Sequence, residues 1–157
     1  MKMNLYGLFV DEIAHEFAKL GIAKFRAAQV AEWIYKRGVQ DFSQMTNLPK
    51  DLRALLQGGF GVDIPEEVSA RHAADGKTSK VLLRFPDGAA VETVLMRQPY
   101  GNSVCVSTQV GCAMGCKFCA STLSGLQRNL SGGEILAQVQ HFQRLLGEGQ
   151  RVTSVVI

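Results

Sequence analysis

Apolar side chains recur every three or four residues through the first sixty positions, which is the spacing of one face of a helix. The pattern predicts helices over residues 11–20 and 25–37, each followed by a glycine that can end it. A shorter helix is expected from Pro49, which suits a first helical position, to just before Gly58. Short amphipathic helices with tight connections predict a small helical domain over residues 1–60.

One aromatic and several basic side chains in this region are candidates for function. Trp33 lies on the apolar stripe of the second predicted helix, where packing in a core is more common than stacking on a base. Basic residues cluster around the same helix: Lys24, Arg26, Lys36 and Arg37. Such a cluster is usually a solvated face, and an RNA-phosphate surface is the alternative.

Strand-like sequence replaces the helical pattern after Gly61. Residues 80–85 and 89–96 are rich in β-formers, and the Pro86-Asp87-Gly88 turn sequence separates them. They predict a β-hairpin connector over residues 61–100.

Glu92 is the unusual residue of this hairpin, because it shares one face of its strand with Val94 and Met96. Charged residues are seldom buried without a purpose. Taken alone, the pattern favours a solvated or edge-strand glutamate.

The last third of the chain reads as strand, loop, helix and strand. Residues 103–109 alternate like a strand, Ser131 and Glu134 form a capping box that opens a helix, and residues 152–157 are β-branched. This order predicts a βαβ unit with parallel strands, and therefore an α/β fold over residues 101–157. One such unit cannot close a barrel or cover both faces of a sheet, so we expect a fragment of a larger α/β fold. Active sites of these folds lie at the carboxyl ends of the strands.

Composition narrows the class of protein. Among 157 residues, 46% are hydrophobic and 20% are charged, as in soluble globular proteins. The net charge of +3 is compatible with a nucleic-acid partner without requiring one. The apolar run near the N-terminus is broken at Asp11, too early for a secretory signal, and no run is long enough to cross a membrane. We therefore expect a cytoplasmic protein with reduced cysteines.

The four cysteines are the main candidates for binding a metal or a cluster. Cys112, Cys116 and Cys119 follow a C-x3-C-x2-C spacing, and Cys105 precedes them on the predicted strand. A structural zinc site takes four ligands, commonly in two pairs, and no second pair exists here. A 4Fe–4S cluster can use three thiolates if something other than protein fills the fourth iron. The spacing favours such a cluster, with zinc or free thiols as alternatives. The three histidines (His15, His72 and His141) have no partner at ligand spacing.

Several sequence segments resemble a known family. The stretch CAMGCKFC, with Phe118 before the last cysteine, resembles the cluster motif of radical S-adenosylmethionine enzymes. The segments VETVLM, SVCVSTQVGC, CKFCAST and GLQRNLSGGEILAQV are similar to the RlmN/Cfr family of RNA adenine methyltransferases. The stretch FRAAQVAEWIYKRGVQDFSQMTNLPKDLRALL resembles the helical N-terminal domain of that family. The helical N-terminus and the segment CASTLSGLQRNL favour the RlmN branch over the Cfr branch.

The resemblance implies a fold, cofactors and roles for individual residues. It implies a TIM-like radical S-adenosylmethionine barrel, with Cys112, Cys116 and Cys119 holding a 4Fe–4S cluster that also binds S-adenosylmethionine. It implies methylation of carbon two of adenine in large-subunit ribosomal RNA and in transfer RNA, through a methylated cysteine and a transient disulfide. Cys105 matches the resolving thiol of the family and Glu92 its proton acceptor. An electron donor such as flavodoxin is implied as a partner, and the helical domain would recognise RNA.

Two parts of the family pattern are absent from these residues. The GEP-type segment that binds S-adenosylmethionine is missing, and no cysteine follows Cys119 to carry the methyl group. We therefore expect the 157 residues alone to be inactive, and their last third to fold poorly if at all. A Cfr-like or other radical S-adenosylmethionine enzyme and a zinc-stabilised RNA-binding module are the competing hypotheses.

Overall fold

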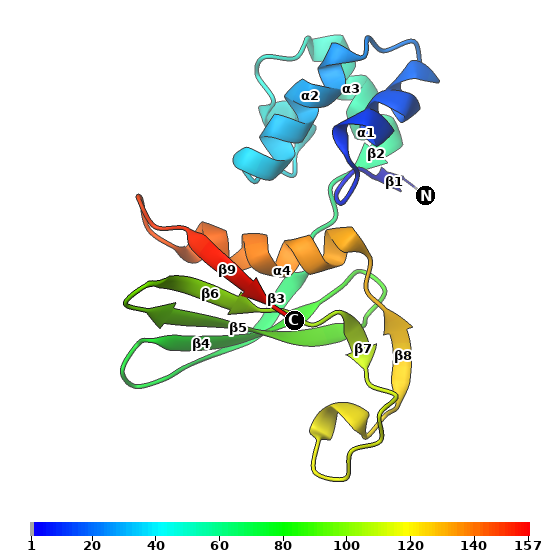
Figure 1. Ribbon diagram of the computed structural model, residues 1–157. Helices are drawn as coiled ribbons and strands as arrows, with labels where there is room; N and C mark the ends of the chain where they lie inside the picture. Colours follow the sequence, from blue (N-terminus) through cyan, green and yellow to red (C-terminus); the bar gives the residue numbers. More distant parts are fainter. Residues whose placement is uncertain (1) are drawn as a thin grey trace. The chain divides into compact units, whose positions relative to one another are not determined.

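The computed structural model describes residues 2–157, which form two compact units that meet in sequence between Asp63 and Ile64 (Figure 1). The first unit is mainly helical, and the second contains a β-sheet with one long helix. Each unit has its own elements and its own buried side chains, so each is described by itself.

The helical unit contains the predicted helices. Its elements in order are β1 (Met3–Asn4), α1 (Val10–Ala18), α2 (Phe25–Ala31), η1 (Glu32–Lys36), η2 (Phe42–Gln44), α3 (Lys50–Gly59) and β2 (Phe60–Gly61). The predicted helix 25–37 is divided, because its last turn, η1, is a π-helix rather than an α-helix. Helix α3 continues through Gly58 and Gly59 instead of stopping before them. Phe60 then enters the core, where its ring lies 5.6 Å from that of Phe17.

Trp33 is half-buried beside the core of this unit. Its indole Nε1 donates a hydrogen bond of 2.6 Å to Oδ1 of Asn47. The guanidinium of Arg37 lies 4.1 Å from the centre of its ring, which is cation–π distance. The side chain therefore packs on one side and is covered by an arginine on another, and does not lie fully in the core.

The second unit is a five-stranded sheet with strand order β3-β4-β5-β6-β9. Its elements are β3 (Glu66–His72), β4 (Thr78–Arg84), β5 (Ala90–Gln98), β6 (Gly101–Cys105), β7 (Gln109–Gly111), η3 (Ala120–Thr122), β8 (Leu126–Asn129), α4 (Gly132–Leu145) and β9 (Val152–Val156). Strands β3 to β6 are antiparallel neighbours, while β6 and β9 are parallel. The predicted βαβ unit, β6–α4–β9, is therefore confirmed.

Helix α4 lies across one face of the sheet (Figure 1). The capping box opens it as predicted, since Ser131 Oγ accepts from the Glu134 N–H and the Glu134 carboxylate accepts from the Ser131 N–H. The apolar stripe of α4 packs on alternate residues of the strands, which are buried together with it: Val81, Leu83, Leu95, Val104, Val106, Phe142 and Leu146. Within residues 64–157, no helix lies on the opposite face of the sheet.

In the second unit, the sequence pattern did not predict three of the strands. All seven residues of β3 are exposed, so no alternation of apolar and polar side chains marks it. The short strands β7 and β8 pair with each other as a separate two-stranded ribbon. The strand predicted over 103–109 ends at Cys105, and the chain then leaves the main sheet to form β7. None of the helices in residues 2–157 is long and apolar enough to cross a membrane.

Candidate functional site

Glu92 and Cys105 lie on the face of the sheet opposite α4. In the register of β5 and β6, Cys105 is opposite Val94, and Glu92 is two residues before Val94 on the same face. The two side chains are thus diagonal neighbours on adjacent strands. Cys105 is half-buried. The side chain of Glu92 is 58% exposed, and its Oε1 lies 2.8 Å from Nζ of Lys80 on β4.

Side-chain hydrogen bonds hold the backbone at the end of β6. The side chain of Gln138 on α4 is fully buried, and it accepts from the Ser107 N–H and donates to the Ser107 carbonyl, both at 2.8 Å. The Ser107 hydroxyl donates to the Glu92 carbonyl, and the Thr93 hydroxyl donates to the Cys105 carbonyl, again at 2.8 Å. Sequence reasoning missed Gln138. Its position could have indicated a buried hydrogen-bonding role, because Gln138 is a polar residue on the apolar stripe of the helix.

The other three cysteines lie on an arm that projects from the sheet unit (Figure 1). The arm consists of β7, β8 and the loop between them. At the base of the loop the Cys112 N–H donates to the Gly125 carbonyl at 3.2 Å. Cys112 and Cys119 are half-buried, Cys116 is exposed, and all three are free thiols.

Short-range hydrogen bonds shape this loop. The Met114 N–H lies 3.5 Å from the Cys112 sulfur, and the Cys119 N–H donates to the Cys116 carbonyl at 3.1 Å. The hydroxyl of Thr122 donates to the Cys119 carbonyl at 2.9 Å. These contacts fix the backbone of the loop around the three thiols.

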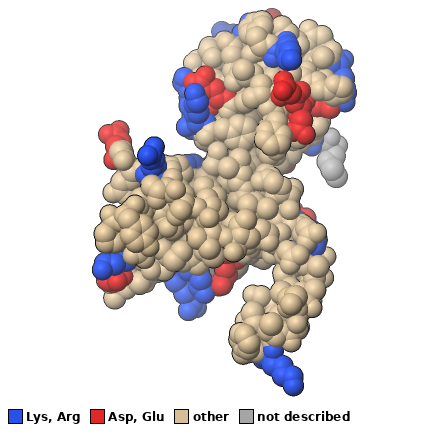
Figure 2. All heavy atoms as spheres, in the orientation of Figure 1, with Lys and Arg blue, Asp and Glu red and all other residues tan. Residues whose placement is uncertain are grey.

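The surface of the loop is apolar and nearly uncharged. Met114, Phe118 and Leu123 are between 78% and 95% exposed. Lys117 is the one charged residue between positions 112 and 127, and the arm carries little charge on the face drawn in Figure 2. An exposed apolar loop of this kind is suited to being covered by another group or chain segment.

The thiols can be tested against the two metal centres that the sequence suggested. Within residues 2–157 no three His, Cys, Asp or Glu side chains are grouped so that they could hold one metal ion. A structural zinc site needs four such ligands around a single ion at about 2.0–2.3 Å. A 4Fe–4S cluster makes a different demand, since each thiolate binds a separate iron. The donor set of three free thiols on one loop fits the cluster better than zinc.

Among residues 2–157, no histidine joins the cysteines in a group that could hold a metal ion. His15 is exposed on α1, and His72 Nδ1 lies 3.0 Å from Oγ of Ser79. Nε2 of His141 lies 2.9 Å from a carboxylate oxygen of Glu67. Burial lowers the pKa of His141 below its usual value, although Glu67 opposes this shift.

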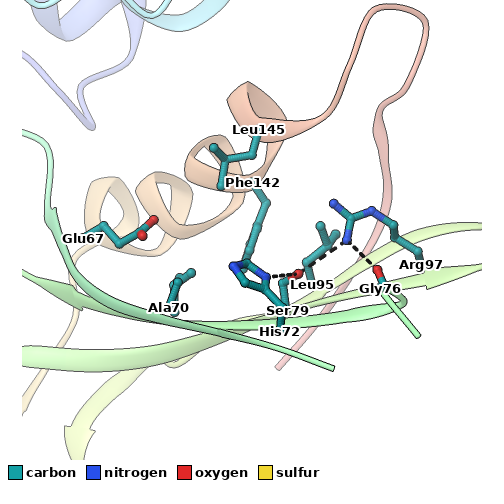
Figure 3. A pocket seen from close by; sticks show the side chains of 10 residues that line it. Glu67, Ala70, His72, Gly76, Ser79, Leu95, Arg97, Phe142 and Leu145 are labelled. Atoms are coloured by element: carbon teal, nitrogen blue, oxygen red, sulfur yellow. Dashed lines mark hydrogen bonds between the residues drawn. The ribbon is translucent and has the colours of Figure 1, made fainter. Parts of the chain in front are cut away.

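One cavity, of about 430 Å³, opens between β3, β4, β5 and α4 (Figure 3). Leu95 and Phe142 form part of its apolar wall. Nη1 of Arg97 donates to the Gly76 carbonyl at 3.1 Å on its polar side. The cavity lies on the α4 side of the sheet, whereas Glu92 and Cys105 lie on the other side. It is therefore separate from the predicted site residues, none of which lines it.

Comparisons with known proteins agree with the sequence motifs. Residues 3–61 match the family described as ribosomal RNA large subunit methyltransferase N-terminal domain. The chain is 50% identical over 156 residues to a probable dual-specificity RNA methyltransferase RlmN from Symbiobacterium thermophilum, covering 99% of this chain and 42% of that protein. A protein of the same name from Staphylococcus aureus is 49% identical over 157 residues, covering 99% of this chain and 43% of the relative.

A solved structure shows the same fold. The crystal structure of a radical SAM methyltransferase from Sphaerobacter thermophilus aligns with a TM-score of 0.88 and 42% identity, covering 99% of this chain and 46% of that one. The chain spans less than half the length of these relatives. The likeness predicted from the motifs is confirmed: the chain resembles RlmN methyltransferases along almost its whole length, and residues 3–61 match the N-terminal domain of that family.

Proposed function

We propose that this chain provides the helical domain and the cluster-binding segment of a radical S-adenosylmethionine methyltransferase. Its product would be adenine methylated at carbon two in large-subunit ribosomal RNA, and in transfer RNA as well. The observation that carries the proposal is the identity of about 50% to RlmN proteins over a segment that includes all four cysteines. The activity would be located in the cytoplasm.

The cysteine loop would hold the cofactors. Cys112, Cys116 and Cys119 would each ligate one iron of a 4Fe–4S cluster, and S-adenosylmethionine would occupy the fourth iron. When bound, and with the cluster reduced by a flavodoxin-like donor, the cluster and S-adenosylmethionine supply the one-electron chemistry that activates a methyl group. The loop supports this role through its free thiols and through an exposed surface that lacks competing charged ligands.

Cys105 and Glu92 would act on the RNA rather than on the iron. The thiolate of Cys105 would attack the sulfur of the cysteine that had carried the methyl carbon and form a disulfide with it. The carbon–sulfur bond would break with its electron pair going to the departing carbon on the adenine, which would take up a proton to become the methyl group. Glu92 would accept the proton that leaves carbon two of the adenine. Their position as diagonal neighbours on the helix-free face of the sheet supports a shared task. In an incomplete TIM-like barrel this face would line the interior.

The helical unit would contact RNA. Two of its arginines stack on aromatic rings, Arg37 on Trp33 at 4.1 Å and Arg26 on the exposed Phe25 at 4.6 Å. Both pairs combine a positive charge with a flat ring, which are the two features that bind phosphates and unpaired bases. They support RNA recognition by this unit.

Anaerobic reconstitution with iron and sulfide tests the cluster. We expect a brown protein with about four irons per chain and no zinc. Replacing Cys112, Cys116 or Cys119 by alanine should abolish iron retention. Cys105→Ala is the matched control, because Cys105 is a neighbouring thiol that should not ligate iron. A colourless chain that binds one zinc would overturn the proposal.

A methyl-transfer assay tests the rest. The 157 residues alone should not methylate deproteinised ribosomal RNA, because no cysteine follows Cys119 to carry the methyl group. Methylated adenine above the no-enzyme background would refute this part of the proposal, together with the role given to a later cysteine.

A further inference from the structure

Arg128 connects three parts of the sheet unit at the base of the cysteine arm. It lies on β8, the strand by which the arm returns. Its Nη2 and Nη1 lie 2.8 and 3.0 Å from the two carboxylate oxygens of Glu134, in the first turn of α4. The same Nη2 lies 2.7 Å from the carboxylate of Asp87, in the turn between β4 and β5. The guanidinium also lies 5.7 Å from the centre of the Phe85 ring.

The geometry of this contact is that of a strong ion pair. The forked pairing with Glu134 uses two parallel N–H···O bonds, which fix orientation as well as distance. The side chains of Arg128 and Glu134 are only 32% and 23% exposed, so solvent screens the pair less than it screens an ordinary surface pair. Burial acts to raise the pKa of Glu134, but hydrogen bonds from Arg128 and Ser131 outweigh it and hold the pKa below its ordinary value.

Two hydrogen bonds from Gln138 on α4 hold Ser107, just before β7, and few other directional contacts anchor the arm. Strands β7 and β8 have three and four residues, and their ribbon is not hydrogen-bonded to the main sheet. Its base rests on a small cluster of buried side chains, Phe85, Val91, Val110 and Leu130. Such a cluster excludes water but does not fix direction, because hydrophobic contact is non-directional. On β8, the strand by which the arm returns, the directional contacts to α4 and to the β4–β5 turn come from Arg128 at the edge of this cluster.

We propose that Arg128 is a positioning residue, which holds the cysteine loop in one orientation relative to the sheet face that carries Glu92 and Cys105. This role rests on the proposed function, since it presumes that the loop carries the cluster. Glu134 then has two tasks, as the cap of α4 and as the fixed point to which the arm is attached. The loop and the helix would therefore be fixed together.

The test compares Arg128→Gln and Arg128→Lys with Arg71→Gln, a change at an exposed arginine on β3. The first measurement is amide hydrogen exchange of the chain without metal, which does not depend on the cluster. Arg128→Gln should speed exchange in residues 107–130 by about tenfold or more, while residues 90–105 keep their protection. Arg128→Lys keeps the charge but not the fork, so it should restore only part of the protection.

The second measurement is the electron paramagnetic resonance spectrum of the reconstituted, reduced chain. Because the cysteines are intact, the iron content of Arg128→Gln should equal that of the unaltered chain. Its spectrum should broaden, because the surroundings of the cluster, and with them its g values, vary when the loop is held in several orientations. Equal exchange and equal spectra in Arg128→Gln and Arg71→Gln would overturn the proposal. Loss of protection across the whole sheet unit would also overturn it, because Arg128 would then be a general structural support. Failure of the unaltered chain to bind iron would count against the proposed function, and the exchange data would still decide the role of Arg128.

Discussion

Replacing Gly111 by alanine should loosen the cysteine loop at its base. Gly111 has a φ of +76°, in the left-handed region, and a Cβ at this position would run into the carbonyl oxygen of Gly125. That oxygen accepts the hydrogen bond from Cys112, so relieving the clash moves the acceptor away from the first cysteine of the motif. The left-handed backbone costs alanine about 1–2 kcal/mol, and the broken hydrogen bond costs about 1 kcal/mol. The sum, about 2–3 kcal/mol, corresponds to roughly a 30- to 150-fold increase in the open population of the loop.

Gly76→Ala is the matched control for this change. Gly76 has nearly the same φ, +69°, but a Cβ there meets no atom within 4 Å. It should therefore show only the backbone cost, in the distant turn between β3 and β4. Hydrogen exchange of residues 109–129 and iron retention after reconstitution measure the effect. If Gly111→Ala loses no more protection in the arm than Gly76→Ala, the close contact with Gly125 does not hold the loop.

Three further changes test the sheet unit. Phe142→Ala should lower the free energy of unfolding by about 3–5 kcal/mol in urea titrations, whereas Leu145→Ala, at a 57% exposed position, should cost far less. Glu92→Gln should change that free energy by less than about 1 kcal/mol, because Glu92 and Lys80 are both exposed; a larger loss would indicate a structural role for the carboxylate. His141 has a lowered pKa in the folded chain, so the unfolded chain binds its proton more readily and stability should fall as pH drops through 6.5. Melting temperatures from pH 8 to 5 should show a weaker pH dependence in His141→Gln, and an unchanged profile would contradict this assignment.

Local sequence was sufficient for the elements with strong periodicity. The helix near residues 11–20, the capping box at Ser131 and the βαβ order of the last third all follow from contacts within a few residues or from a regular apolar stripe. The cysteine spacing likewise placed three thiols on one loop. These predictions succeeded because each depends on residues that are close together in the chain.

Tertiary structure decided the features that depend on distant residues. The strand β3 has no apolar alternation and exists because it pairs with β4. Glu92 and Cys105 share a face through the register between their strands, and Gln138 reaches Ser107 across 31 positions. No local pattern contains these relations.

The amino-acid sequence by itself determined which residues could carry the chemistry: three clustered thiols, one thiol outside the cluster and one carboxylate on a strand. The tertiary structure decided where they are held. It places Glu92 and Cys105 on the face of the sheet that no helix of residues 64–157 covers, and it puts the other cysteines on an arm joined to α4 through Arg128. The physical reason is that strand register and ion pairs are set by the packing of the whole unit, whereas residue type and spacing are local properties of the chain.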